Sequence, residues 1–252
     1  MNLFSQSSLY GKGIFTTISI INSDPFLMAK HWRRLSIDAD RLGIDISDFD
    51  DQTLVKLLAA KLREAKLING RARITFTDER AAEIWSASSG DSEMGASVQI
   101  VVGGSRHIPP NFQLTISPFP VNSRSPLAGV KSCNYLEQIL SLNEAKGRVF
   151  HEAVRVNERG HVTSGCMSNV FWLKDDRLYT PTLATGCLAG TTREYVLENV
   201  ECEEVEAEIG ELESADAIYL TSAGLGIVRV AEFDGRELPD TKHPIQNLWP
   251  PS

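Results

Sequence analysis

The stretch LAGVKSCNYLEQ, residues 127–138, places a lysine inside a small, apolar run. Lys131 is the only charged residue between Arg124 and Glu137, so it has no neighbour in sequence to pair with. Burial disfavours the charged form of an amine, and a neutral amine can condense with an aldehyde. The opposite interpretation is a surface lysine whose stem covers apolar residues while its ammonium stays in water. This stretch alone leaves both interpretations open.

The composition is that of a globular chain. Its 252 residues are 42% hydrophobic and 23% charged, which is enough for a core in one large domain or two smaller ones. The net charge of −8 argues against a nucleic-acid partner, because such binding needs clustered Lys and Arg. No apolar run approaches the ~20 residues that span a bilayer, and the start lacks a signal-peptide pattern. We therefore expect a cytoplasmic protein with no membrane partner.

Cysteine spacing does not predict a metal site. The four cysteines form no C-x-x-C pair and have no zinc-like spacing from any of the five histidines. We therefore expect no metal and a reduced protein. The cysteines are Cys133, Cys166, Cys187 and Cys202.

The first 120 residues show both strand and helix patterns. GIFTTISII, residues 13–21, is rich in β-branched residues and predicts a strand. Apolar residues then recur every three or four positions and predict a helix that ends at Gly43. Its apolar face carries Met28, Trp32, Leu35, Ala39 and Leu42, and the opposite face carries His31, Arg34, Asp38 and Arg41. We expect a second helix over 53–66 and strands over 71–77, 83–87, 97–102 and 113–117.

Proline, asparagine and serine gather between residues 119 and 126, which indicates a linker. We therefore expect a small domain over 1–120, a linker over 121–126 and a larger domain over 127–252. In the second part the pattern predicts helices over 135–148 and 191–199. It predicts strands over 154–156, 170–173, 177–180, 217–221 and 226–230, and a short strand at Val162. No regular βαβα alternation appears, and the usual nucleotide, zinc-protease and esterase motifs are absent from the sequence.

The segment CLAGTTR, residues 187–193, has the composition of an anion site at a helix start. Gly190 allows a close approach of the backbone, and the first N–H groups of a helix can bind phosphate. Thr191 and Thr192 add hydroxyl groups. Thr191 and Glu194 also have the spacing of a capping box, so an ordinary capped helix is the alternative.

Ordered segments along the chain resemble the class IV aminotransferases, which are fold type IV pyridoxal-phosphate enzymes. The resemblance runs from about Gly11 to Gly235. The family includes branched-chain and D-amino-acid aminotransferases and aminodeoxychorismate lyase. The segments are YGKGIFTT, HWRRL with RLGI, AGVKSCNYLEQ, GHVTSGCMSNVFW, YTP with LAGTTR, and TSAGLGIVRV. The resemblance implies an α/β fold of two domains, a small N-terminal one and a larger C-terminal one, with the cofactor between them. It also implies a homodimer and a small amino-acid-like substrate.

The resemblance also implies roles for single residues. Lys131 matches the lysine that forms a Schiff base with pyridoxal 5'-phosphate and moves the substrate proton. Arg34 matches the arginine that grips the phosphate. Residues matching substrate contacts are Thr16, Thr17 and Arg73. The remaining matches to cofactor-binding positions are Tyr135, Ser164, Asn169, Thr191, Thr192, Ser222 and Ala223.

One position departs from the family pattern. The family has V-T-E-G where this chain has Val162-Thr163-Ser164-Gly165. The missing glutamate holds the pyridine nitrogen protonated in the family, whereas a serine carries no charge to stabilise a pyridinium. The expected result is a weaker electron sink. Elimination depends on that sink less than full transamination does, because a β-leaving group departs once the proton is lost.

We therefore expect lyase chemistry first, namely loss of pyruvate from 4-amino-4-deoxychorismate to give 4-aminobenzoate. The short chain and the AGVKSCNYLEQ segment also resemble aminodeoxychorismate lyase more than branched-chain aminotransferase. Three alternatives stay open. They are an amino-acid aminotransferase of the same fold, a cofactor-binding homologue of low activity, and a non-enzymatic scaffold in which Lys131 is structural.

Overall fold

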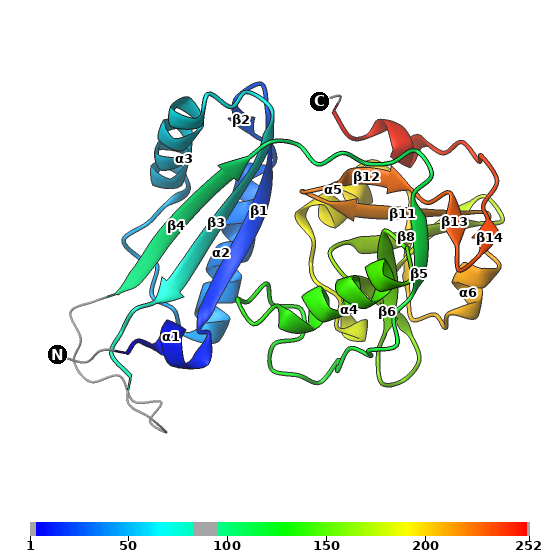
Figure 1. The fold of residues 1–252 in the computed structure, drawn as a ribbon, viewed down its shortest axis with the longest axis horizontal. Helices are drawn as coiled ribbons and strands as arrows, with labels where there is room; N and C mark the ends of the chain where they lie inside the picture. The colour runs from blue at the N-terminus through cyan, green and yellow to red at the C-terminus, as the bar shows by residue number, and fades with distance from the viewer. Residues whose placement is uncertain (1–3, 83–94, 251–252) are drawn as a thin grey trace. The chain divides into compact units, whose positions relative to one another are not determined.

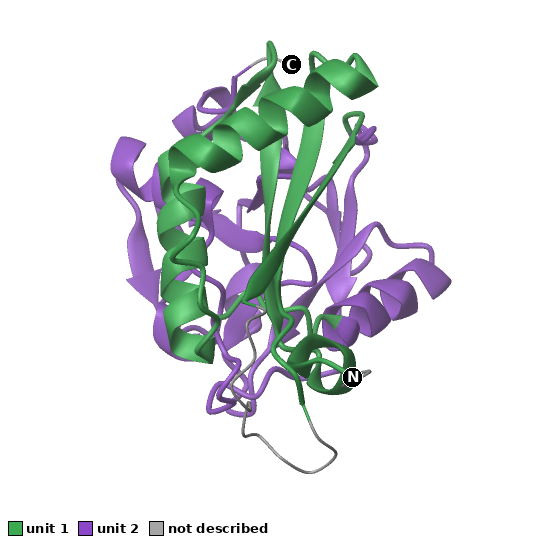
Figure 2. Cartoon of the chain, turned by 90° about the vertical axis from the view of Figure 1, so that its left-hand side faces the viewer, with its two compact units in different colours: residues 1–105, 130–135 green, residues 106–129, 136–252 purple. Residues whose placement is uncertain are grey.

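The computed structural model describes residues 4–82 and 95–250. Two compact units make up the chain (Figure 2). Unit 1 comprises residues 1–105 and 130–135, and unit 2 comprises residues 106–129 and 136–252. Helices and strands occur in both units, as the two-domain α/β prediction requires. The predicted strand over 83–87 lies outside the described residues.

Unit 1 is built on an antiparallel sheet with the strand order β2-β1-β3-β4 (Figure 1). The strands are β1 (Gly13–Ile21), β2 (Asp24–Pro25), β3 (Gly70–Asp78) and β4 (Ala96–Gly103). The three predicted strands that lie in the described part of this sheet are confirmed, with ends shifted by at most one residue. A short helix that the sequence pattern did not predict, α1 (Gln6–Tyr10), precedes β1.

Two long helices, α2 (Met28–Leu42) and α3 (Asp51–Ala65), pack on one face of this sheet (Figure 2). Their apolar faces meet Ile14, Ile18 and other alternate residues of β1 and β3, which form one core. Gly43 ends α2 in a left-handed conformation at φ 61°, as the sequence predicted. The opposite face of α2 is not exposed throughout, because His31 and Asp38 are only 1% and 4% exposed.

Residues 130–135 belong to unit 1 because they lie along β1. Phe15 N donates to Lys131 O at 2.9 Å, and Cys133 N donates to Gly13 O at 2.8 Å. Val130 joins the core of unit 1. These backbone bonds fix the position of Lys131 relative to the first strand, although more than 100 residues of chain separate the two segments.

Unit 2 contains two five-stranded sheets (Figure 1). The first has the order β14-β13-β5-β6-β7 and the second the order β10-β9-β8-β11-β12. Residues from both sheets form a shared core, including Leu114 and Val154 from the first and Trp172 and Leu220 from the second. The strands of the first sheet are β5 (Gln113–Ile116), β6 (Glu152–Val156), β7 (Val162–Gly165), β13 (Glu232–Phe233) and β14 (Arg236–Glu237). Those of the second are β8 (Asn169–Lys174), β9 (Arg177–Pro181), β10 (Glu203–Val205), β11 (Ala217–Ser222) and β12 (Gly226–Arg229).

The helices of unit 2 are short. They are α4 (Leu136–Gly147), α5 (Thr191–Asn199) and α6 (Gly210–Glu213), with 3₁₀ turns over Leu183–Thr185 and Pro244–Asn247. The predicted helices over 135–148 and 191–199 correspond to α4 and α5. The pattern did not predict α6, β10, β13 or β14, because segments of two to four residues are too short to show a period.

The division into units differs from the predicted domain boundaries. We expected 113–117 in the first domain, but β5 pairs in parallel with both β6 and β13 of unit 2. We expected 130–135 in the second domain, but their backbone bonds join β1. Turn residues in a sequence show where the chain bends, whereas hydrogen-bonded partners decide which unit a segment joins.

Candidate active site

Lys131 is half-buried and surrounded by aromatic side chains of unit 1. Its Nζ lies 4.4 Å from the ring centroid of Phe15 and 4.7 Å from that of Tyr135. It donates to the Tyr135 hydroxyl at 3.3 Å. Burial, followed by the positive charges of Arg34 and Arg73, lowers the pKa of Lys131 to about 7, and Asp38 only partly opposes this. A large fraction of Lys131 is therefore a neutral amine near pH 7, which favours the first of the two interpretations that LAGVKSCNYLEQ left open.

Arg34 on α2 is held by a hydroxyl of β1. Its Nη2 donates to Thr16 Oγ1 at 2.7 Å, and the same Oγ1 lies 2.7 Å from His31 Nδ1. A guanidinium can only donate, so Oγ1 accepts from Arg34. Thr16 is fully buried, and His31 Nδ1 is the acceptor that the structure offers for its hydroxyl proton. His31 is therefore neutral with its proton on Nε2.

Electrostatics support that state of His31. Burial, with the nearby charges of Arg34 and Lys131, moves the pKa of His31 well below its usual value. Our expectation for Thr16 was a substrate contact. The structure places its hydroxyl between an arginine and a histidine, where it orients Arg34.

Asp38 ties α2 to the lysine segment, and sequence reasoning did not single it out. Its Oδ2 accepts from Lys131 N at 3.2 Å. Burial raises the pKa of Asp38, although the bond from Lys131 N and the charge of Arg34 act in the opposite direction. His31, Arg34 and Asp38 recur at i, i+3 and i+7, which puts them on one side of a helix. That spacing was the available signal. We call Lys131, Thr16, His31, Arg34 and Asp38 the lysine cluster.

Arg73 and Thr17 lie on the other face of the unit 1 sheet. They are opposite one another on β3 and β1. The Arg73 guanidinium lies 3.5 Å from the ring centroid of Phe15, and its Nε donates to Thr75 Oγ1 at 3.1 Å. Phe15 thus has cationic groups of both Arg73 and Lys131 against its ring. The structure therefore links Arg73 to Lys131 through one aromatic side chain, a contact that the sequence did not predict.

In unit 2, α5 begins without a side-chain cap. Its N-cap is Gly190, and Thr191 is the first helical residue. The predicted capping box is therefore wrong, because the N-cap position carries no side chain that could accept from the helix. The Oγ1 of Thr192 is buried and has no hydrogen-bond partner in the described part of the chain. Its hydroxyl lies in the first turn, where helix N–H groups favour an anion.

Asn169 on β8 holds the chain that leads into α5. Its Nδ2 donates to Leu188 O at 2.8 Å. A Cβ at Gly190 would lie 2.0 Å from Asn169 Oδ1, so the close approach requires glycine. Asn169 is paired with Thr221 of β11, and Thr221 Oγ1 is buried with no partner among the described residues. Sequence reasoning missed Thr221 because it falls at the end of the predicted strand over 217–221, one residue before the family match at Ser222.

Ser222 organises the turn between β11 and β12. Its Oγ accepts from Leu225 N at 3.2 Å. We call Asn169, Thr192, Thr221 and Ser222 the polar cluster of unit 2. Buried polar atoms in native proteins are rarely without a partner, so two such hydroxyls in one cluster indicate a ligand site.

Comparison with known proteins identifies the family. A family model described as amino-transferase class IV matches residues 13–233. The chain belongs to the class IV aminotransferase family. Members of this family are pyridoxal-phosphate-dependent enzymes that act as aminotransferases or as lyases, and this chain is such an enzyme. The family resemblance predicted from the ordered segments is thereby confirmed.

Individual relatives include both activities. The chain is 27% identical over 239 residues to an aminodeoxychorismate lyase of Bacillus subtilis, across 92% of this chain and 80% of that protein. It is 26% identical over 249 residues to a putative branched-chain-amino-acid aminotransferase of Methanocaldococcus jannaschii, across 94% and 83%. A crystal structure of a putative 4-amino-4-deoxychorismate lyase from Legionella pneumophila matches with a TM-score of 0.86 at 26% identity, covering 98% and 91%.

The class IV fold places Ser164 on β7, where it is half-buried opposite Arg155 of β6. A buried carboxyl, Glu152, lies on the same strand as Arg155. Its Oε1 accepts from Met167 N at 2.6 Å and from Ser168 Oγ at 3.1 Å. Burial raises the pKa of Glu152. Glu152 lies three positions from Arg155 on β6, so its side chain leaves the face of β6 opposite to the one that Arg155 shares with Ser164.

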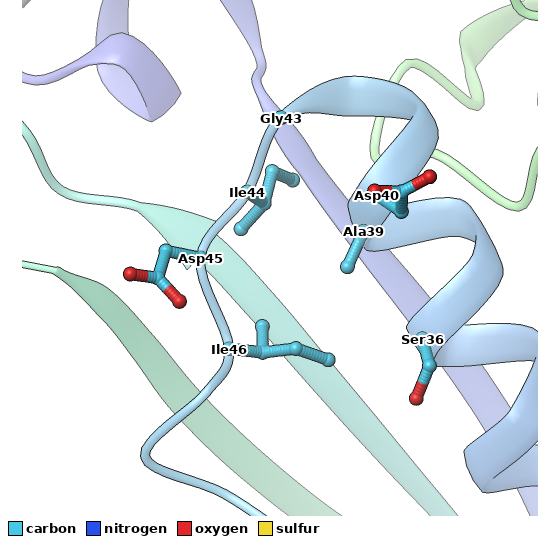
Figure 3. Close-up of a pocket in the computed structure, with 7 residues that line it drawn as sticks. All are labelled: Ser36, Ala39, Asp40, Gly43, Ile44, Asp45 and Ile46. Atoms are coloured by element: carbon cyan, nitrogen blue, oxygen red, sulfur yellow. The ribbon is translucent and has the colours of Figure 1, made fainter.

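A pocket of about 410 Å³ in unit 1 contains none of the predicted site residues (Figure 3). It lies between the last turns of α2 and the following loop, and Asp45 there accepts from Ser47 N at 3.0 Å. Its lining is Ser36, Ala39, Asp40, Gly43, Ile44, Asp45 and Ile46. We assign it no part in the class IV chemistry. Among the described helices, none has the length and apolar character needed to cross a membrane.

Proposed function

We propose that this class IV enzyme is an aminodeoxychorismate lyase, which eliminates pyruvate from 4-amino-4-deoxychorismate and gives 4-aminobenzoate. The proposal is carried by a half-buried lysine with a pKa of about 7, in a chain that has Ser164 on β7 where the family pattern V-T-E-G has a glutamate. The lyases of Bacillus subtilis and Legionella pneumophila, at 27% and 26% identity, support the same activity.

The residues of the chain fit pyridoxal phosphate. Lys131 supplies an amine that is neutral in part at pH 7. Thr192 and Thr221 supply buried hydroxyls without partners in the described part of the chain, and Gly190 leaves the start of α5 uncapped by a side chain. We propose that Lys131 binds the aldehyde, that Arg34 binds the phosphate, and that Thr191, Thr192, Ser222 and Ala223 provide further phosphate contacts. Tyr135, Ser164 and Asn169 are the proposed ring contacts.

Bound pyridoxal phosphate supplies an electron-withdrawing ring that lowers the energy of negative charge on the substrate carbon. Lys131 accepts the substrate proton at Nζ, because an amine with a pKa of about 7 is a base at neutral pH. The rings of Phe15 and Tyr135 cover Nζ and keep water away from it. The Tyr135 hydroxyl, 3.3 Å from Nζ, accepts from Lys131 and directs it.

Arg34 contributes a fixed positive charge. Its Nη2 is held on Thr16, whose hydroxyl is held in turn on His31, so the guanidinium is oriented before any ligand arrives. Arg73 lies against Phe15 on the outer face of the sheet, where its guanidinium is exposed and able to bind a substrate carboxylate. We propose that Arg73 and Thr17 contact the substrate.

The test supplies the purified protein with 4-amino-4-deoxychorismate and measures pyruvate by a coupled lactate dehydrogenase assay, with 4-aminobenzoate followed by its fluorescence. We expect equal amounts of both products, and neither from Lys131→Ala. A protein that makes no pyruvate but converts the cofactor to its pyridoxamine form with an amino acid is an aminotransferase instead. The relative of Methanocaldococcus jannaschii is the observation that favours this second function.

A protein that binds the cofactor but catalyses neither reaction is the low-activity homologue. A protein that binds no cofactor is not an enzyme of either kind. We propose a homodimer on the family resemblance alone. Light scattering after gel filtration tests this proposal.

A further inference from the structure

Arg155 is a buried cation beside the position where this chain departs from its family. It lies on β6, and the sheet register pairs it with Ser164 of β7. Opposite residues of an antiparallel pair project from the same face, with Cβ atoms about 4.5–5.5 Å apart. Arg155 is only 2% exposed. The buried arginine is therefore the cross-strand neighbour of the serine that takes the place of the usual glutamate.

The charge of Arg155 is held mainly by carbonyl groups. Its Nε donates to Phe119 O at 3.2 Å and its Nη2 to Pro120 O at 3.1 Å. Arg155 also forms an ion pair with Glu137, whose Oε2 lies 3.5 Å from Nη2 and whose side chain is 78% exposed. An exposed partner compensates a buried charge weakly, because water screens the pair. Arg155 thus contributes a positive potential around Ser164.

Other titratable groups near Arg155 do not cancel this potential. Glu152, on the same strand, is fully buried, and burial raises its pKa. Glu152 and Arg155 are three positions apart, so the two side chains leave opposite faces of β6. Burial raises the pKa of Cys166 to about 12, so its thiol is neutral. The remaining carboxyl group is that of Glu137, from α4, which is the exposed partner described above.

We propose that Arg155 and Ser164 together keep the ring nitrogen of bound pyridoxal phosphate unprotonated. The proposal rests on the proposed function, since it takes Ser164 as the residue beside that nitrogen. Two positive charges in a poorly hydrated place repel, so Arg155 disfavours a pyridinium. The Ser164 hydroxyl can donate to a neutral ring nitrogen but cannot compensate a charged one. In the family, a glutamate carboxylate favours a proton on the ring nitrogen. In this chain, Ser164 replaces that carboxylate and the charge of Arg155 opposes the proton.

The consequence concerns the choice of reaction. An unprotonated ring withdraws less electron density, so it stabilises a substrate carbanion less. Reprotonation at the cofactor, which completes a transamination, needs that carbanion to persist. Loss of a leaving group from the neighbouring carbon consumes it at once. Arg155 therefore acts as a positioning and electrostatic residue that favours elimination.

The test measures the protonation state of the nitrogen directly. The holoenzyme is prepared with pyridoxal phosphate labelled with ¹⁵N in the ring, and the ¹⁵N resonance is followed with pH. We expect the neutral-pyridine resonance in the wild type across the range in which the protein is folded. In Arg155→Leu we expect the proton affinity of the nitrogen to rise about tenfold or more. Arg155→Lys, which keeps the charge, is expected to behave like the wild type.

Ser164→Glu provides a second readout that leaves Arg155 in place. We expect it to shift the resonance toward the protonated position, and more so in combination with Arg155→Leu. A protonated nitrogen in the wild type overturns the inference even if no Arg155 variant folds, and so does an Arg155→Leu protein that titrates like the wild type. Failure of the protein to bind the labelled cofactor instead contradicts the proposed function, and the two failures are distinct.

Discussion

Removal of one buried hydroxyl tests whether the lysine cluster is organised as the structure shows. Thr16→Val keeps the shape of the side chain and deletes Oγ1. The lost hydrogen bond from the Arg34 guanidinium is worth about 1.5–3 kcal/mol, and that to His31 Nδ1 about 1 kcal/mol. Because Arg34 is only half-buried, we expect the free energy of unfolding to fall by about 2–3 kcal/mol. For a chain of this size that corresponds to a Tm lower by about 5–10 °C.

Two matched variants isolate the hydroxyl. Thr16→Ser retains it and loses one methyl group, which is worth about 0.8 kcal/mol. Thr17→Val makes the same change at the adjacent residue, which is half-buried and has no side-chain hydrogen bond within the described structure. We expect the free energy of unfolding to change by no more than about 0.5 kcal/mol. Thermal unfolding of the apoprotein measures all three. Titration with pyridoxal phosphate then gives the Kd, which we expect to rise about tenfold in Thr16→Val only, since Arg34 loses its orientation.

The pH dependence supplies an independent check on His31. Its pKa in the folded protein lies well below the 6.5 of the unfolded chain. Above about pH 6.5 the imidazole is neutral in both states. Below it the unfolded chain takes up a proton first, so His31 lowers stability by up to about 1.4 kcal/mol per pH unit. A Thr16→Val protein as stable as Thr17→Val, or a His31 found protonated on Nδ1 at neutral pH by ¹⁵N NMR, refutes this account of the cluster.

The remaining predictions concern three ionisable side chains. The rate at which the apoprotein binds pyridoxal phosphate should increase as pH rises through about 7 and then level off, because Lys131 must lose its proton. Visible absorbance measures this rate. A rate independent of pH would contradict the lowered pKa of Lys131. Asp78 is buried, but its bonds to Arg80 and Lys12 outweigh burial and lower its pKa to about 2. Asp78 therefore adds about 2 kcal/mol to the free energy of unfolding above pH 4, and this contribution is lost between pH 4 and 2. Asp78→Asn should lack the contribution at neutral pH. Unfolding measured as a function of pH in both proteins tests this. Glu152→Gln should change stability by less than about 1 kcal/mol, because a glutamine oxygen can still accept from Met167 N and Ser168 Oγ. Glu152→Leu should cost about 2–3 kcal/mol by leaving both donors unpaired, and urea unfolding distinguishes the two outcomes.

Local patterns predicted most of the regular elements of this chain. The spacing of Met28, Leu35 and Ala39 predicted α2, and Gly43 predicted its end, because a helix buries one face and ends where a left-handed residue is tolerated. Both are properties of residues a few positions apart, so they can be inferred from the sequence alone. The apolar run around Lys131 left a buried amine and a surface lysine both open, because burial and the charges of Arg34 and Arg73 come from distant segments.

Contacts between distant segments could not be predicted in this way. The Thr191–Glu194 spacing matched a capping box, yet the chain folds so that Gly190 becomes the N-cap, and Asn169 from another strand occupies the space beside it. His31 looked like a polar residue on the outer face of α2, and it became a buried acceptor only when β1 brought Thr16 against it.

The sequence by itself determined the family and the helices and strands with a clear period, and it singled out Lys131 as the candidate Schiff-base lysine. The tertiary structure decided which unit residues 113–117 and 130–135 join, how Arg34 is oriented, and that Arg155 is the partner of Ser164. The physical reason is the range of the interactions. Periodicity and helix ends depend on residues a few positions apart, whereas strand register and the burial of a charge depend on partners that only the folded chain brings together.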